Sequence, residues 1–411
     1  MKITPVKGTN DYLPNDAALR DRLQSVILET YKNHGFEHII TPAIEDAENL
    51  DKSEGGDNLN LIFKILKRGE KLEKAIEAGK LNELSDMGLR YDLTLPLCRY
   101  YSANKAFLPT PAKLIQIDRV YRAERPQKGR DREFHQCDID IIGSSSVDCE
   151  IELITTTAKA LKNVGIGNFR IKINDRTLLR GVLSRAGFLP EAFDTVSVTF
   201  DKMDKIGRDG VLAELESKGF DESVIANFTR FLDACPVSID SIGEYSDATD
   251  AADRIKHIIA SVNEISDGAY DVDFDISLVR GQGYYTGTVF EIESKDFRGA
   301  IGGGGRYDNL IGKFTGTPTP AVGFSIGFER IFSILRDAGA KSSEKSRIAV
   351  VYDSGDVARA IKFADTLRGE YDVLVTERAN KLGKQLARLE ERGFAGYATL
   401  DGEVKLFADR K

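Results

Sequence analysis

Apolar side chains recur at helical spacing near the start of the chain, in residues 16 to 34. This spacing predicts an amphipathic helix, and Gly35 favours its end because glycine tolerates the left-handed backbone found at helix C-termini. An extended apolar run follows in residues 36 to 44 and contains Pro42. Residues 60 to 88 alternate apolar positions with Lys and Glu, which we interpret as an exposed helical stretch.

A second pattern, with a period of two residues, marks 113 to 125 and 133 to 143. Alternation of this kind predicts strands, and the intervening PQKGRDR has the Pro, Gly and charged residues typical of a turn. The two segments therefore predict an antiparallel hairpin with a cationic tip. Before it, residues 89 to 104 predict a strand that leads into a helix.

The middle of the chain is mainly helical in pattern. Residues 149 to 165 predict a helix, and FRIKIND after it predicts a strand. Residues 176 to 269 lack a motif that we recognise and separate two sheet-forming regions, so we interpret them as an inserted helical domain. Residues 277 to 294 predict a hairpin-like pair of strands, and 322 to 339 predict a strand that passes into a helix.

Strands and helices alternate after a Ser, Lys and Glu linker, which predicts an α/β unit with parallel strands. We therefore predict an α+β protein with two domains. The first, 1–340, has an antiparallel sheet and the helical insertion at about 176–269. The second, 346–411, is the α/β unit.

Composition agrees with an ordinary enzyme: of 411 residues, 41% are hydrophobic and 30% are charged. The N-terminus has no apolar segment typical of a signal peptide, and no run reaches the roughly 20 apolar residues of a membrane span. The four cysteines show no CxxC spacing, which argues against disulfides and zinc. We expect a cytoplasmic protein without membrane association and assign no metal ligands.

The net charge of −8 is unusual for a protein that binds nucleic acid, because phosphate contacts need Lys and Arg. The distribution of charge matters more than the sum. Residues 113 to 132 hold seven Lys or Arg and only three Asp or Glu. This segment could be a solvated charged loop or a local basic groove in an acidic protein.

Polar residues of the predicted hairpin suggest a ligand site. Arg122 and Glu124, two apart, would share one strand face; a guanidinium can hold a phosphate, and a carboxylate can accept a hydrogen bond from an exocyclic amine. Phe134 could stack on a base. Gln136 and Asp140 would also share a face and offer an amide and a carboxylate to a small polar ligand.

Simpler interpretations exist for other candidates. The glycine run 302–305 could be a phosphate loop, but no GK[ST] follows, which favours tight packing instead. His135 alternates with Phe134 and Gln136, so we expect it on the non-catalytic face of its strand. An isolated pair such as Tyr284 and Tyr285 on a strand is usually one core and one surface aromatic.

The segment ERPQKGRDREFHQ resembles motif 2 of class II aminoacyl-tRNA synthetases, in the form typical of histidyl-tRNA synthetases. GFEHIITPAIED is similar to motif 1, which includes Pro42 and builds the dimer interface in that class. VGFSIGFERIF is similar to motif 3. LRYDLTLP and RGQGYYTGTVFEI resemble the amino-acid-binding strand and the histidine-recognition motif of the histidine enzymes. The resemblance covers residues 7 to about 335.

This resemblance implies that the chain forms histidyl-adenylate from L-histidine and ATP with Mg²⁺ and transfers histidine to tRNA(His). It also implies a homodimer through the motif 1 region. The residues implied to bind histidine are Asp92, Thr94, Gln136, Asp140, Tyr284 and Tyr285. Those implied to bind ATP are Arg122, Glu124, Phe134, Arg280 and Arg330, of which Arg122 and Arg280 would be catalytic.

Two departures from the family pattern bear on these expectations. The histidine motif usually reads RGLDYY, whereas this chain has Gln282 and Gly283 in its middle. The C-terminal unit resembles the anticodon-binding domain but is shorter than expected.

Two rival functions follow from these features. One is a regulatory subunit of ATP phosphoribosyltransferase, which binds histidine without aminoacylation; retention of Arg122, Glu124, Arg280 and Arg330 argues against it. The other is a relative that passes histidine from the adenylate to an acceptor other than tRNA.

Overall fold

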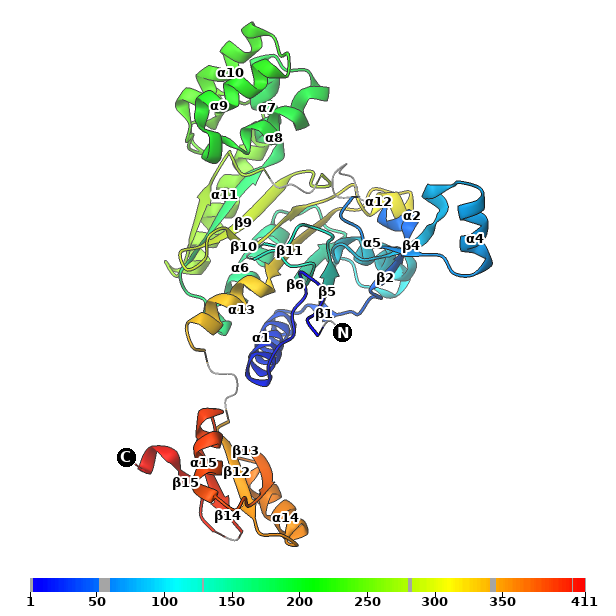
Figure 1. Ribbon diagram of the computed structural model, residues 1–411. Helices are drawn as coiled ribbons and strands as arrows, with labels where there is room; N and C mark the ends of the chain where they lie inside the picture. The colour runs from blue at the N-terminus through cyan, green and yellow to red at the C-terminus, as the bar shows by residue number, and fades with distance from the viewer. Residues whose placement is uncertain are drawn as a thin grey trace. The chain divides into compact units, whose positions relative to one another are not determined.

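The chain forms two compact units in a computed structural model (Figure 1). The described residues are 3–51, 60–127, 129–279, 283–340, 345–400 and 402–410. The larger unit holds Met1–Leu13 and Leu23–Gly339, and the smaller holds Pro14–Arg22 and Ala340–Lys411. The first helix, α1 (Pro14–Asn33), contributes to both units.

The larger unit is built on an eight-stranded sheet. In sheet order its strands are β1 (Glu37–His38), β5 (Ala112–Tyr121), β6 (Glu133–Ile142), β11 (Ala321–Gly327), β10 (Ala300–Arg306), β9 (Thr288–Ser294), β7 (Phe169–Asp175) and β8 (Asp271–Phe274). Neighbours run antiparallel except at the two edges, where β1 and β8 pair in parallel with β5 and β7. The predicted antiparallel-sheet fold is confirmed.

The hairpin of β5 and β6 lies inside this sheet, as predicted. Its register runs from the pair Ala112 and Ile142 to the pair Tyr121 and Glu133. From Cys137 to the end of β6 every side chain is buried, on both faces of the strand. Any polar group in this stretch therefore needs a partner or a ligand.

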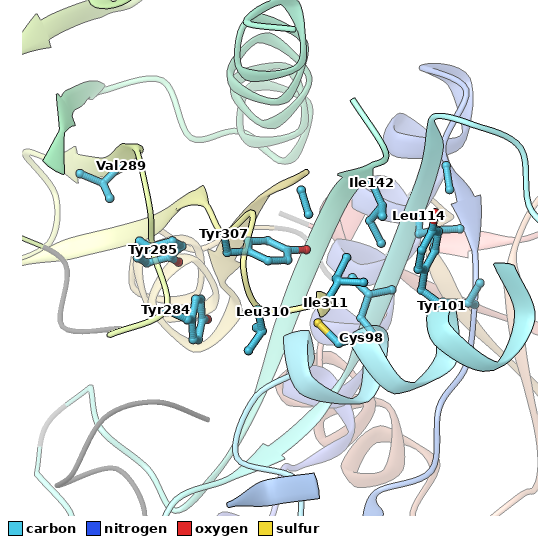
Figure 2. Packing of buried hydrophobic residues seen from close by; sticks show 14 of the residues in the cluster. Cys98, Tyr101, Leu114, Ile142, Tyr284, Tyr285, Val289, Tyr307, Leu310 and Ile311 are labelled. Atoms are coloured by element: carbon cyan, nitrogen blue, oxygen red, sulfur yellow. The ribbon is translucent and has the colours of Figure 1, made fainter. Parts of the chain in front are cut away.

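Three helices pack on the sheet. They are α6 (Asp148–Val164), which contacts β6 and β11, α11 (Thr249–Ser266), which contacts β7 and β8, and α13 (Phe328–Asp337), which contacts β6 and β10. The short α12 (Gly312–Thr315) contacts α5 (Thr94–Asn104). Cys98 and Tyr101 of α5 pack in one cluster with Leu114 and Ile142 of the sheet (Figure 2).

The expectation of a helical stretch at 60–88 is largely wrong. Its residues form β3 (Lys64–Leu66), α4 (Glu70–Glu77) and β4 (Ser85–Leu89), and β4 also pairs with β2 (Ile44–Asp46) in a three-stranded sheet. A short helix, α2 (Ala47–Leu50), follows β2. Lys and Glu favour helices intrinsically, but pairing with a neighbouring strand overrides this weak preference.

The insertion is helical, as predicted, and has its own aromatic core. Its helices are α7 (Arg176–Ala186), α8 (Phe193–Phe200), α9 (Met203–Ser217), α10 (Glu222–Ala234) and α11. The ring of Phe228 lies 5.6–6.0 Å from those of Phe188, Phe200 and Phe231. The last helix, α11, packs on α6 and the sheet, so it belongs as much to the sheet as to the insertion.

The smaller unit contains a four-stranded sheet. In order its strands are β13 (Asp372–Glu377), β12 (Arg347–Tyr352), β14 (Gly396–Thr399) and β15 (Lys405–Leu406), with helices α14 (Val357–Leu367) and α15 (Leu382–Glu391). The first three strands are parallel, as predicted, and β15 is antiparallel to β14. Across both units, none of the described helices has the length and apolar character needed to cross a membrane.

Candidate active site

A cavity of about 270 Å³ lies against the polar face of β6 in the larger unit. Ten of the eleven residues implied by the family resemblance line it: Asp92, Thr94, Arg122, Glu124, Phe134, Gln136, Asp140, Tyr284, Tyr285 and Arg330. The eleventh, Arg280, lies outside the described residues, as does Gln282. Segments far apart in sequence thus meet at one site.

Strand β6 supplies the polar wall of the cavity. Because side chains alternate along a strand, Gln136, Asp138 and Asp140 all face the cavity. Cys137 and Ile139 face the other way and are fully buried. We did not predict Asp138 as a site residue, although the same alternation that marked Gln136 and Asp140 could have found it.

Asp92 does not lie on a strand, contrary to our expectation for LRYDLTLP. It follows the end of β4, and its Oδ1 accepts a hydrogen bond from the backbone N–H of Leu95 (3.1 Å) in the first turn of α5. A carboxylate at this position satisfies one of the free N–H groups of a helix start. The other oxygen, Oδ2, is buried and has no hydrogen-bond partner within the described part of the chain.

Three carboxylates, which we call the acid cluster, meet in this part of the cavity: Asp92, Asp138 and Asp140. Each is at most 4% exposed. Burial raises the pKa of all three carboxyls. Repulsion from the other acids raises the pKa of Asp138 and Asp140 further, whereas the nearby Arg122 lowers that of Asp92. The pKa of Asp138 is raised well above its usual value, and that of Asp140 is raised to about 7. A cationic ligand would relieve this repulsion.

Tyr307 is a further site residue that sequence reasoning missed. Its hydroxyl donates a hydrogen bond to Asp140 Oδ1 (2.5 Å), which lowers the pKa of that carboxyl against the effect of burial. The ring of Tyr284 lies 4.9 Å from that of Tyr285 and 6.0 Å from that of Tyr307 (Figure 2). The only sequence signal for Tyr307 is its place directly after the glycine-rich strand.

Tyr284 and Tyr285 correct another expectation. They lie before β9 in a turn and an irregular segment, so SLVRGQGYYTG does not supply a strand in its described part. Both side chains are buried, at 7% and 8% exposure, so neither is a surface aromatic. The backbone carbonyl of Tyr285 accepts a hydrogen bond from Arg176 (3.0 Å), which fixes this segment against the start of α7.

Glycines in β10 and β11 keep the cavity open. A Cβ on Gly323 would collide with the carboxylate of Asp140, and one on Gly304 would collide with the backbone oxygen of Gly323. A Cβ on Gly305 would lie 2.9 Å from the ring of Tyr285. The glycine run is a paired strand of the sheet, so the phosphate-loop alternative is wrong. Close packing against the neighbouring strands and side chains explains why these positions are glycine.

Arg122 and Glu124 lie beyond the end of β5 rather than on one strand face, which corrects our expectation. Strand pairing stops at Tyr121, and the N–H of Arg122 donates instead to the carbonyl of Arg132 (2.9 Å) in the connecting loop. The guanidinium of Arg122 lies 4.3 Å from the ring centroid of Tyr91 and 5.0 Å from that of Phe134. Cation–π contacts at these distances are favourable.

Arg122 joins Arg130 and Arg330 on the cavity wall; we call these three the arginine group. Arg130 pairs with the carboxylate of Glu124 (3.4 Å). Arg330, in the first turn of α13, donates a hydrogen bond to the carbonyl of Ala300, and its guanidinium lies 5.8 Å from the ring of Phe297. Unlike Asp138 and Asp140, which lie on β6, these cations lie on loops and a helix start.

Glu329 lines the cavity beside Arg330 and was not predicted. Its Oε1 accepts from the backbone N–H of His135 (3.1 Å), and its Oε2 accepts from the hydroxyl of Tyr12 (3.3 Å). The His135 ring packs 5.6 Å from that of Phe328 and is not among the described residues of the cavity wall, in agreement with our expectation. Within the described chain, no group of three or more His, Cys, Asp or Glu is arranged to hold a metal ion.

Comparison with known proteins gives the family. The sequence profile described as histidyl-tRNA synthetase matches residues 8–331. The histidine–tRNA ligase of Leifsonia xyli subsp. xyli (strain CTCB07) is 39% identical, over 99% of this chain and 97% of that protein. A probable histidine–tRNA ligase of Tropheryma whipplei (strain Twist) is 38% identical, over 98% of this chain and 96% of that protein.

Solved structures agree. The histidyl-tRNA synthetase from Nostoc sp. PCC 7120 matches with a TM-score of 0.82 at 25% identity, over 100% of this chain and 96% of that one. A Bacillus halodurans C protein described as an ATP phosphoribosyltransferase regulatory subunit/histidyl-tRNA synthetase matches with a TM-score of 0.78 at 20% identity, over 97% of each chain, and shares the fold. With a profile match over most of its length and near-full-length relatives above 30% identity, this chain belongs to the histidyl-tRNA synthetase family.

Proposed function

We propose that this chain is a histidine–tRNA ligase, which activates L-histidine with ATP and transfers it to tRNA(His). One observation carries the proposal: buried acceptors without partners share a cavity with arginines. Asp92 Oδ2 and Gln136 Oε1 are both buried and have no hydrogen-bond partner among the residues that the structure describes. A buried acceptor without a donor is costly, so this part of the cavity favours a ligand with several N–H groups.

Histidine fits this requirement. Its α-ammonium would be held by Asp92 and Gln136, whose free oxygens would accept two N–H groups, together with Thr94. Its imidazole would lie between Asp140 and Tyr285, with Tyr284 beside them. A carboxylate next to one ring nitrogen keeps a proton on that nitrogen and so selects the tautomer. Tyr307, already bonded to Asp140, would hold that carboxylate in place.

The arginine group suits ATP. Phe134 and Arg330 would hold the adenine ring, and Glu124 would accept a hydrogen bond from its amino group. In activation, a carboxylate oxygen of histidine attacks the α-phosphorus, a new P–O bond forms, and the bond to pyrophosphate breaks. Arg122 and Arg280 would neutralise the charge that grows at the phosphoryl oxygens. Catalysis of this type depends mainly on positioning and electrostatics.

Mg²⁺ would enter with ATP. This ion usually binds through substrate phosphates and only one or two protein carboxylates. Glu124, Asp131 and Glu329 are carboxylates that line the cavity near the arginine group, and so the residues fit such an ion. When bound, Mg²⁺ supplies positive charge to the phosphate chain.

Transfer to tRNA would involve the smaller unit. We propose residues 346–411 as a shortened anticodon-binding-like domain and residues 1–340, with the insertion at about 176–269, as the class II catalytic domain. The cationic side chains that line a shallow pocket of the smaller unit are Lys381, Lys384, Arg388 and Arg392. Such a group attracts a phosphate backbone, and binding should weaken with added salt.

We propose further that the protein is a homodimer in the cytoplasm. Large apolar side chains of the motif 1 region and its neighbouring sheet are exposed: Ile40 at 78%, Ile44 at 50% and Met87 at 40%. Exposed apolar groups of this kind are typical of a subunit interface. All four cysteines are free thiols, which suits a reducing compartment.

Histidine-dependent exchange of pyrophosphate into ATP, followed by charging of tRNA(His), tests the main proposal. Exchange with histidine but with none of the other amino acids is expected, as is charging that falls steeply with salt. Tight histidine binding without exchange would replace this proposal by the regulatory-subunit function. Exchange without charging would favour an acceptor other than tRNA.

A further inference from the structure

Residues 6–9, which we call the N-terminal strap, lie against the loop that joins β5 to β6. The strap is a tight turn: the N–H and the hydroxyl of Thr9 both donate to the carbonyl of Val6, at 2.9 and 2.8 Å. Gly8 in this turn has φ +89°, a left-handed backbone conformation that favours glycine. The turn directs the Gly8 carbonyl to the N–H of Arg132 (2.6 Å).

Arg132 connects the strap to both sides of the loop. Its Nε donates to the carbonyl of Glu124 (3.0 Å), and its Nη1 donates to the carbonyl of Lys7 (3.4 Å). Its own carbonyl accepts from the N–H of Arg122 (2.9 Å). The backbones of two residues that line the cavity, Arg122 and Glu124, are therefore tied to one arginine that is not among the described residues of the cavity wall.

The strap also fits closely against the loop. A Cβ on Gly8 would lie 2.7 Å from Pro126 Cγ and 2.9 Å from Arg132 Cγ, both closer than real Cβ contacts. No larger residue fits at position 8 unless the strap or the loop moves. The contact surfaces of strap and loop are thus matched in shape as well as in hydrogen bonding.

We infer that the N-terminal strap and Arg132 are positioning elements for the ATP part of the site. This inference rests on the proposed function, in which Arg122 and Glu124 contact ATP. Moving the strap would displace the loop and with it both residues. The histidine part of the site would stay in place, because Gln136 and Asp140 are held by the pairing of β6 with β5 and β11. Loss of the strap contact should therefore weaken ATP binding selectively.

Gly8→Ala is the principal test, and Gly35→Ala is its matched control. Gly35 has a similar φ of +81°, but a Cβ there would meet no atom of the described residues within 4 Å. Both variants carry the same backbone strain, and only Gly8→Ala also disturbs the loop. Arg132→Lys is a second variant without backbone strain, which keeps the charge but loses the fork of donors.

The measurements are the Kd for ATP by calorimetry and the KM values for ATP and histidine in pyrophosphate exchange. We expect Gly8→Ala and Arg132→Lys to raise the Kd and KM for ATP by about fivefold to tenfold, as for the loss of one or two hydrogen bonds. In these two variants the KM for histidine should change less than about twofold. In Gly35→Ala the Kd and the KM for ATP should also change less than about twofold. Unchanged ATP constants in both strap variants, or an equal rise for histidine, would overturn the inference.

The binding measurement separates this inference from the proposed function. If the natural protein binds ATP but shows no histidine-dependent exchange, the proposed function is wrong. The ratio of ATP dissociation constants between Gly8→Ala and Gly35→Ala still decides the role of the strap in that case.

Discussion

The acid cluster and the arginine group line one cavity but are built in opposite ways. Asp138 and Asp140 lie on a strand paired on both sides, and all three acids are almost fully buried. The arginines lie on a loop and at a helix start, and Arg130 is still 57% exposed. Strand pairing fixes Asp138 and Asp140, and a hydrogen bond from the start of α5 holds Asp92, whereas the arginines depend on loop contacts. This difference predicts that substitutions at Asp92, or at Tyr307 beside Asp140, change the strength of histidine binding, whereas substitutions among the arginines change turnover.

The largest expected effect comes from Asp92→Asn, which removes the charge that would face the ammonium of histidine. Losing one partner of a buried, hydrogen-bonded charge pair costs about 2–5 kcal/mol. We therefore expect kcat/KM for histidine in pyrophosphate exchange to fall by about 1000-fold. Asp221→Asn is the control, because Asp221 also accepts an N–H group at a helix start, but in α10. A similar, small loss in both variants would show that Asp92 only caps its helix.

Arg122→Ala should have the next largest effect and should act on turnover. Removing one preorganised donor to a reacting group typically lowers kcat by about 100-fold or more. We expect the kcat of exchange to fall by about that factor, with the KM for histidine changed less than about threefold. The control is Arg119→Ala, since Arg119 is on the same strand end but pairs with Glu133 at 3.8 Å. Equal losses in kcat and histidine affinity would remove the distinction between the two sets of residues.

Tyr307→Phe should weaken histidine binding by about tenfold, because a hydrogen bond to a charged group contributes about 1.5 kcal/mol or more. It should also shift a pH profile. In the proposed site the carboxylate form of Asp140 would bind histidine, so kcat/KM should rise as the pH rises through a pKa of about 7. The Tyr307 hydrogen bond lowers this pKa, so the inflection should move to higher pH in Tyr307→Phe. Histidine itself titrates in the same way with the natural protein and with Tyr307→Phe, so it cannot cause a difference between their profiles. An inflection at the same pH in both would contradict its assignment to Asp140.

Asp138→Asn should have the smallest effect, and on stability instead of activity. Burial raises the pKa of Asp138 in the folded state. A carboxyl with a raised folded pKa costs stability as the pH rises above its unfolded pKa, near 4. Removing this carboxyl should therefore increase the free energy of unfolding at pH 8 by roughly 1 kcal/mol, which raises the thermal midpoint. The increase should be much smaller at pH 4. Calorimetry at both pH values measures this; a lower midpoint at pH 8 would mean that Asp138 stabilises the fold.

Much of the polar wall of the cavity was predictable from the sequence because its side chains come from one strand, β6. A period of two residues is a local property, and it located β5, β6 and the shared face of Gln136 and Asp140. The same pattern includes Asp138, which we overlooked. The cavity position of the ten family residues was likewise expected from the resemblance, although their roles remain predictions.

Other features depend on distant parts of the chain and left no local signal. The alternation of side chains continues through Arg122 and Glu124, but the strand pairing of β5 with β6 ends at Tyr121. Beyond it the N–H of Arg122 donates to the carbonyl of Arg132, and the N–H of Ala123 donates to the carbonyl of Leu61. Within residues 60–88, β3 and β4 form because they pair with each other and β4 also pairs with β2. Tyr307 reaches Asp140 only after β10 and β11 have joined the sheet. Each outcome requires tertiary structure that periodicity does not contain.

The position of the insertion also has a consequence for how the chain assembles. Strand β7 pairs only with β8 and β9 in the described sheet, and both follow the insertion in sequence. During synthesis the partners of β7 are therefore made only after the whole insertion, and until then both edges of β7 are unpaired. The aromatic core around Phe228 lets the insertion collapse first, which shortens the loop that pairing of Arg170 with Asp271 has to close. The eight-stranded sheet can therefore be completed only after the helical insertion has been synthesised.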